Sequence, residues 1–348
     1  MRSLALGLLL SSPAAAAQEW TSLDADVNAL TESLSAQSHG PDIGGWMATR
    51  FTTTSDVPPG SPDMAGFGIE VARVILHGHR GDYEYMLDYD FAANALEDAA
   101  IGFPCAAGIH IHVGRIGAPI GTSGELNDAL LFFPNRTFSG EGQGALDTGV
   151  RFYHQHGSLH SNLSVTNGSD GTADEYLVAG RLSYDLTGNG ALLHSEGAYD
   201  GPESVATTAS VSYFDDGGVA GSLDADGLVL DVRAVTNVYS VAVEWMDVGD
   251  ALSTFFPAAG PGAPGLVPRS TPWNAQGTWR ASQDWELGLR IQELDDSAQT
   301  SVLDFAASRT FPGEGRDLSW TLGWTRLETS AALGGDVDTL LARLLIIL

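Results

Sequence analysis

Lysine is absent from this sequence, so all 16 of its basic residues are arginines, and 44 Asp and Glu oppose them. The formal charge of −28 argues against nucleic acid or anionic lipid as a partner, because both carry negative charge. Without lysine, there is no Gly-rich loop followed by Lys to cradle a phosphate. An acidic surface is also what a saline habitat favours, since acidic side chains stay hydrated there. The charge therefore narrows the partners without naming a function.

Cysteine and long apolar runs are also scarce. The one cysteine, Cys105, rules out a framework of intramolecular disulfides. No apolar run approaches the ~18 residues that a membrane-spanning helix needs. Glycine and proline are plentiful, at 42 and 15 residues, and they predict many turns and few helices.

The N-terminus predicts export. The apolar run Leu4–Leu10 follows Met1-Arg2, and the small residues Ala14–Ala17 come next. These are the n-region, h-region and cleavage site of a secretory signal, so we interpret residues 1–17 as a signal peptide.

Within a periplasmic segment at 18–40, residues 21–38 predict a short helix of the coiled-coil type. Its apolar residues have the spacing of a and d positions: Leu23, Val27, Leu30 and Leu34. Two heptads are only marginally stable alone in water, so this helix needs a surface to pack on. Two surfaces remain open, the periplasmic rim of its own barrel or the same helix in neighbouring subunits.

From residue 41 onward the sequence alternates with a period of two. In residues 82–91 one parity is aromatic or apolar and the other is acidic, which predicts a strand with one apolar and one wet face. Turn signals separate further segments of this kind. We expect strands near 43–54, 66–79, 82–92, 96–103, 108–116, 146–154, 157–166, 175–185, 191–199, 205–214, 225–235, 238–247, 273–281, 284–293, 299–307, 317–326 and 338–348.

These ranges number seventeen, whereas a single-chain bacterial barrel has an even strand count. The tight turns Arg80–Asp82 and Thr187–Gly190 are expected at the periplasmic end, and the long connections 117–145 and 248–272 at the extracellular end. An extra strand near 217–224 would give eighteen strands, and the loss of one further hairpin from those eighteen would give sixteen.

The predicted fold class is all-β, an antiparallel transmembrane β-barrel of 16–18 strands over residues 41–348, with a short N-terminal periplasmic helix. A closed barrel satisfies its backbone hydrogen bonds between strands, as hydrocarbon requires. Tyr and Trp near strand ends suit the interfacial girdles. A soluble β-sandwich also alternates, but this many strands behind a signal peptide favour the barrel.

Short motifs over residues 66–168 point to a family. They are Ala72-Arg73-Val74, Gly81-Asp82-Tyr83, Asp90-Phe91, Leu96 to Ala99, Val113 to Ile116, Pro119-Ile120-Gly121, Phe133 with Arg136, and Asn167-Gly168. In order and spacing this segment resembles the start of the phosphate-selective porins of the O/P type. The resemblance implies a trimeric outer-membrane diffusion channel whose pore is narrowed by an inward-folded loop and lined by basic side chains. Glu70 and Val71 replace bases of that family.

The polar parities supply candidate pore-lining charges. They are Arg73, Glu84, Asp88, Asp90, His110, His112, Arg151, Arg181, Asp185, Asp231, Arg233, Glu244, Arg280, Glu286 and Arg290. Each of these side chains has a second interpretation, since charges of opposite sign can simply pair across the wall. As a set they predict a polar lumen for small hydrophilic solutes.

Residues 117–145 form the expected inward loop, and its charges Glu125, Asp128 and Arg136 are candidate constriction residues. A loop this long in a compact fold is usually functional or disordered, and the resemblance favours a constriction loop inside the barrel over a flexible surface loop.

Histidines raise the question of a metal or a catalytic site. His110 and His112 share one face, a spacing that can hold a metal, but solvated lumen residues are the simpler interpretation. His160 lies near Ser158 and Ser161, which is too common a pattern to indicate a hydrolase. We expect no catalytic residue, no metal and no cofactor.

The sequence thus predicts an outer-membrane porin of a Gram-negative cell for passive diffusion of small polar solutes or ions, embedded in lipid and assembled as a homotrimer. Strong phosphate selectivity is not expected, because the lumen parities carry acids and bases in similar number. The alternative is a non-conducting structural or adhesive barrel whose loops plug the lumen.

Overall fold

The computed structural model describes residues 41–55, 65–105, 108–143, 146–168, 176–190, 195–199, 201–216, 225–248, 270–295, 299–311, 318–329 and 336–347. The chain divides into two compact units, Met1–Asp42 and Ile43–Leu348. The predicted signal peptide and N-terminal helix, and the extra strand considered at 217–224, lie outside the described residues. Among the described helices, none is long and apolar enough to cross a membrane.

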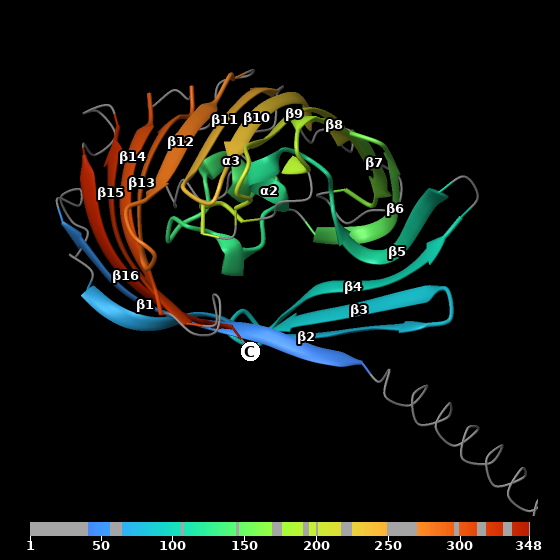
Figure 1. The fold of residues 1–348 in the computed structure, drawn as a ribbon, viewed down its shortest axis with the longest axis horizontal. Coiled ribbons are helices and arrows are strands. Elements are labelled where there is room, and N and C mark those ends of the chain that lie inside the picture. The colour runs from blue at the N-terminus through green and yellow to red at the C-terminus, as the bar shows by residue number, and fades with distance from the viewer. Residues whose placement is uncertain are drawn as a thin grey trace, which may run out of the picture. The chain divides into compact units, whose positions relative to one another are not determined.

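Sixteen antiparallel strands form a closed barrel in which every strand pairs with its sequence neighbour and β1 pairs with β16 (Figure 1). The strands are β1 (Asp42–Ser55), β2 (Ala65–Arg80), β3 (Tyr83–Asp90), β4 (Ala95–Pro104), β5 (Ile109–Gly117), β6 (Leu146–His156), β7 (Leu159–Thr166), β8 (Leu177–Thr187), β9 (Ala206–Asp216), β10 (Ala225–Val235), β11 (Tyr239–Val248), β12 (Trp273–Arg280), β13 (Trp285–Glu293), β14 (Ser301–Thr310), β15 (Leu318–Glu328) and β16 (Val337–Ile347). The predicted barrel class is confirmed, with sixteen strands.

One predicted strand is wrong. Residues 195–199 of the expected strand 191–199 form bends and a turn, and Thr187–Gly190 opens a long connection between β8 and β9 instead of a tight hairpin. The backbone N–H of Glu196 bonds to the carbonyl of Leu130, so this segment finds its partners inside the barrel and not on the sheet. Without this strand, the seventeen predicted strands become the sixteen that the structure contains.

The barrel is apolar outside and polar inside. On β13, Leu289 and Ile291 are 50% and 42% exposed, whereas Glu286 and Arg290 are 5% and 1% exposed. The register continues across the seam, where Leu289 lies opposite Phe305 and Arg290 opposite Asp304. A water-soluble protein shows the opposite distribution, and this inverted one is the arrangement of a transmembrane barrel.

The β5–β6 connection, residues 118–145, is the inward loop. It carries three short helical segments, α2 (Thr122–Glu125), η2 (Asp128–Leu130) and α3 (Phe138–Gln143). In Figure 1, α2 and α3 lie inside the ring of strands. The site is therefore built between this loop and the inner face of the wall.

Candidate functional site

The inward loop begins on an apolar anchor. Ile120 is fully buried in a cluster with Phe214 of β9, Val229 of β10 and Met246 of β11, on the inner face of the wall. The side chain of Ser212 accepts a hydrogen bond from the Gly121 amide at 3.3 Å. The loop is thus held against β9–β11 from its first residues.

Two glycines of the wall let the middle of the inward loop lie close against the inner face of the barrel. A Cβ on Gly288 of β13 would stand 2.4 Å from the Phe132 ring, and one on Gly323 of β15 would stand 2.7 Å from Pro134. Phe133 is fully buried beside them. Because any larger residue would push the loop away, these glycines set the distance between the loop and the wall.

Charged wall residues hold the loop backbone. Glu244 of β11 accepts hydrogen bonds from the Ser123 amide at 3.2 Å and from the Ser139 hydroxyl at 2.8 Å. Arg290 of β13 donates to the Asn135 carbonyl at 2.9 Å, and Arg343 of β16 donates to the Asp128 carbonyl at 2.9 Å. Buried charges of this kind persist only when they are paired and hydrogen-bonded, so the loop and the wall satisfy each other.

The loop is also stiffened from within. Arg136 donates to the carbonyls of Ser123 and Leu126 at 2.7 and 2.6 Å, and to the Asp128 carboxylate at 2.5 Å. One guanidinium therefore ties α2, η2 and the segment before α3 into a single unit.

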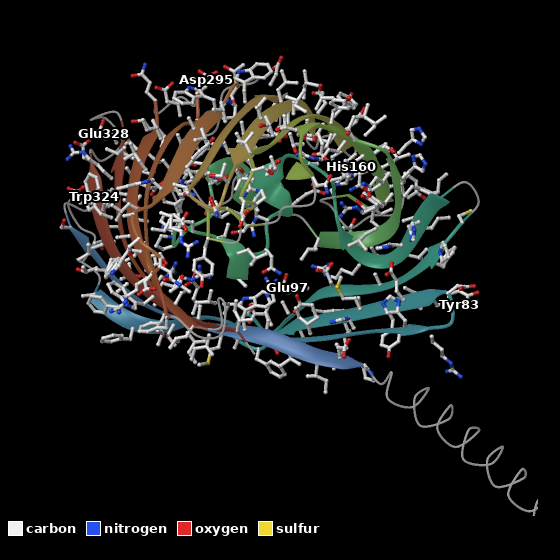
Figure 2. All side chains as sticks on the ribbon, in the orientation of Figure 1. Tyr83, Glu97, His160, Asp295, Trp324 and Glu328 are labelled. Atoms are coloured by element: carbon white, nitrogen blue, oxygen red, sulfur yellow. The ribbon has the colours of Figure 1, made fainter. Side chains whose placement is uncertain are left out.

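A polar cavity of about 880 Å³ lies between the inward loop and the wall from β1 to β10. Eight carboxylates and six guanidiniums line it. In Figure 2, Glu97 and His160 point into the interior, whereas Trp324 points away from it. The cavity is therefore wet and highly charged, with the two signs in similar number.

Arg73 of β2 is the centre of the acidic side of this cavity. Its guanidinium lies 3.5 Å from Asp88, 3.7 Å from Asp90, 3.6 Å from Glu97 and 3.1 Å from Asp128 of the inward loop. Four carboxylates around one guanidinium leave a local excess of negative charge. This side of the cavity attracts cations.

Arg151 of β6 and Arg181 of β8 form the basic side. Glu125 of the inward loop lies 2.6 Å from Arg151 and 3.5 Å from Arg181, so it neutralises both partly. Arg181 also pairs with Asp231 of β10 at 2.9 Å. Every charge in this group is opposed by another, which weakens the field that each would project into the cavity.

A chain of hydrogen bonds lies in the wall beside these arginines. The His160 ring contacts the Asp185 carboxylate at 3.0 Å through Nε2 and the Tyr153 hydroxyl at 3.1 Å through Nδ1. Thr208 donates to the other oxygen of Asp185 at 2.7 Å. The arrangement orients Tyr153 toward the cavity.

The predicted charges fall into three places. Those that line the cavity are Arg73, Asp88, Asp90, Arg151, Arg181, Asp231 and Arg233, with Glu125, Asp128 and Arg136 of the inward loop. Those that are buried in the wall outside its lining are Asp185, Glu244, Glu286 and Arg290.

The remaining four predicted residues lie near the strand ends at the short-turn end of the barrel. The Glu84 side chain occupies the space that a Cβ on Gly102 would need, and its carboxylate lies 2.7 Å from the His112 ring. His110 is exposed. Arg280 lies over the Tyr199 ring at 5.0 Å and donates to the Gln283 carbonyl. These residues belong to the mouth and not to the cavity beside the loop.

Several functional positions are absent from the predicted set. Arg50, Glu70, Glu97 and Asp98 line the cavity. A strict period of two places the adjacent Glu97 and Asp98 on opposite faces, and the pairing of β3 with β4 shifts in register between Leu87 and Tyr89. No local pattern marks Glu196, because its hydrogen-bond partners Phe132 and Phe133 belong to a distant segment of the chain. Among the described residues, no group of three or more His, Cys, Asp or Glu is arranged to hold a metal.

No family model matches this sequence, and no curated protein matches it. The fold has clear relatives among solved structures. The outer membrane channel DcaP of Acinetobacter baumannii is 11% identical with a TM-score of 0.60, covering 89% of this chain and 98% of its own. The trimer form of OmpT, an outer membrane protein of Vibrio cholerae, is 9% identical with a TM-score of 0.57, covering 89% and 100%.

A third solved structure, described as a porin, is 15% identical with a TM-score of 0.54 and covers 88% of this chain and 100% of its own. At these identities the likeness concerns the fold alone. The chain has the fold of the porin-type outer-membrane barrels.

Proposed function

We propose that the protein is an outer-membrane porin of a Gram-negative bacterium and lets small polar solutes or ions diffuse passively. The observation that carries the proposal is the cavity of about 880 Å³ between the inward loop and the wall, polar and lined by charges of both signs. Such a lining replaces part of the hydration of a small solute without binding it tightly, as passage requires. Lipid contacts the apolar outer face, and a homotrimer is the expected assembly.

The motif resemblance of residues 66–168 to the phosphate-selective porins supports the same general function. Strong phosphate selectivity is not part of the proposal. Anion binding needs guanidiniums that no carboxylate opposes, whereas the cavity holds eight carboxylates and six guanidiniums. We expect a pore that is weakly selective for cations or unselective.

The test is the conductance of the purified protein in a planar lipid bilayer, with the zero-current potential measured in a salt gradient. Stepwise conductance with a small potential of the cation-selective sign is expected. A strong anion preference, with current blocked by submillimolar phosphate, would contradict the proposed selectivity and restore the function for which the resembling family is named.

A second candidate function is a non-conducting structural barrel that its loops plug. It is favoured by the observation that the inward loop and residues 195–199 cover the inner face of the wall from β9 to β16. The same bilayer measurement separates the candidates, because a plugged barrel inserts without producing current steps.

A further inference from the structure

A second segment enters the barrel from the end opposite to the inward loop. In a barrel of sequentially paired antiparallel strands, the β5–β6 and β8–β9 connections lie at opposite ends. Residues 195–199 of the β8–β9 connection nevertheless contact the inward loop. In Figure 1 the yellow-green trace of this connection runs inside the ring near α2 and α3. We name residues 195–199 the lumen strap.

Glu196 is the point of contact. Its carboxylate accepts hydrogen bonds from two successive amides of the inward loop, Phe132 at 2.7 Å and Phe133 at 3.0 Å, and its own amide donates to the Leu130 carbonyl at 3.0 Å. Arg290 lies 3.5 Å from the same carboxylate. The Glu196 side chain is almost completely buried. Hydrogen bonds to a charged acceptor are the stronger kind, and burial removes water as a substitute partner.

The lumen strap is fixed to the wall on its other side. The Ala198 amide donates to Glu286 of β13 at 2.6 Å, and Arg233 of β10 donates to the Ser195 carbonyl. Gly197 passes so close to Glu286 that a Cβ would stand 2.7 Å from its carboxylate oxygen. The wall therefore holds the lumen strap in place, and Glu196 of the strap in turn holds the inward loop.

We infer that Glu196 is a positioning residue for the pore: it holds the middle of the inward loop against the wall and so sets the width of the cavity. The inference rests on the proposed channel function. The loop residues on the far side of this contact, Leu131 and Pro134, line the cavity. Movement of the loop at Phe132 and Phe133 consequently changes the space that a solute crosses.

The lumen strap reaches this contact from the end of the barrel opposite to the inward loop. The stretch at Phe132 and Phe133 lies midway along a loop whose ends join β5 and β6, and beside it Arg290 holds the Asn135 carbonyl. A carboxylate delivered from the other mouth supplies the acceptor that two adjacent amides need. Segments at the two mouths are thereby coupled through one side chain.

The test compares Glu196→Ala and the more conservative Glu196→Gln with Glu203→Gln. Glu203 belongs to the same β8–β9 connection and is exposed, so its variant repeats the loss of charge without the loop contact. Two readouts are needed: hydrogen exchange of the loop peptide that contains Phe132 and Phe133, and single-channel current under rising voltage.

We expect loop exchange to rise about tenfold in Glu196→Ala, with added sub-conductance levels and closure at lower voltage. Glu196→Gln keeps one acceptor oxygen and should show a smaller change of the same sign, and Glu203→Gln should match the wild type. Wild-type exchange and current traces in a correctly folded Glu196→Ala barrel would overturn the inference. If Glu196→Ala fails to fold, wild-type behaviour of Glu196→Gln would overturn it.

Failure of the proposed function gives a different result. A wild-type barrel that never conducts would refute the channel, while the exchange measurement would still decide whether Glu196 positions the inward loop.

Discussion

Arg290 and Asp304 face each other across the β13–β14 seam, with the guanidinium Nε 2.7 Å from the carboxylate. Arg290 is 1% exposed, and it also lies over the Phe133 ring at 4.5 Å and within 3.5 Å of Glu196. One wall residue thus joins the sheet, the inward loop and the lumen strap.

Replacement of Arg290 by Met should destabilise the barrel strongly. The change leaves the buried carboxylates of Asp304 and Glu196 without their shared cation, and loss of one partner from a buried pair costs about 3–5 kcal/mol. The free energy of unfolding in lipid vesicles, from urea titration, checks this. Arg326→Gln is the control: Arg326 pairs with Glu328 and Asp336 at an exposed site, where no measurable change is expected. Equal effects of the two variants would contradict the role of Arg290.

Adjacent residues of β3 test which face meets lipid. Met86 and Leu87 are 39% and 41% exposed, but only Met86 lines the cavity. Leu87→Arg should cost about 2–4 kcal/mol, because it places a charge in hydrocarbon. Met86→Arg should fold normally, because its charge lies in a wet lumen near Asp88. The yield of barrel refolded into vesicles measures both, and equal tolerance would show that the register of faces is wrong.

Glu125→Gln should shift the pore toward anions. The variant frees Arg151 and Arg181 from the carboxylate that opposes them at 2.6 and 3.5 Å. The zero-current potential in a salt gradient measures the shift, which should shrink at high salt as the charges are screened. Glu293→Gln removes an equal charge at an exposed site on β13 and should leave the potential unchanged. A shift in the control as large as in Glu125→Gln would assign the effect to net charge alone.

Gly288→Ala should narrow the cavity without unfolding the barrel. A Cβ there would stand 2.4 Å from the Phe132 ring, so the inward loop must move off the wall. Lower single-channel conductance is expected. Gly277→Ala on β12 is the matched change, since its Cβ would meet nothing closer than 3.8 Å. Unchanged conductance in Gly288→Ala would mean that only the Phe132 ring moves and that the inward loop keeps its position.

The sequence predicts that the N-terminal segment, residues 18–40, contributes to a homotrimer. Replacement of Leu30 and Leu34 by Asp should loosen the oligomer and leave the barrel intact, because both residues occupy a or d positions of the predicted helix. Chemical crosslinking of the membrane-embedded protein measures this. An unaltered trimer would mean that the helix packs only on its own barrel.

The strands were largely predictable from sequence because the two faces of a barrel wall impose a period of two. The alternation of Leu289, Ile291 and Arg290 reveals one strand without reference to any other. Strands such as β16 were found for the same reason, although Arg343 was not recognised as facing inward. What alternation encodes is the side of the wall on which a side chain lies: Glu286 and Arg290 of β13 are buried, whereas Leu289 and Ile291 are exposed.

The lumen strap and the details of the cavity were not predictable, because they depend on contacts between distant segments. Glu196 bonds to amides more than sixty residues away, and no local pattern marks such a partner. Segment 191–199 contains enough apolar residues to resemble a strand. In the structure, Glu196 and Ala198 are hydrogen-bonded to the inward loop and to Glu286 instead.

The pairing of β1 with β16 has a consequence for the order in which the barrel forms. All other seams join strands that are consecutive in the chain, whereas this seam brings Trp46 beside Ile347. Contacts between residues so far apart form late, since a long stretch of chain must be ordered first. Arg343 of β16 donates a hydrogen bond to the Asp128 carbonyl of the inward loop, so this contact also needs β16 to be in place. The final position of the inward loop therefore depends in part on closure of the β1–β16 seam.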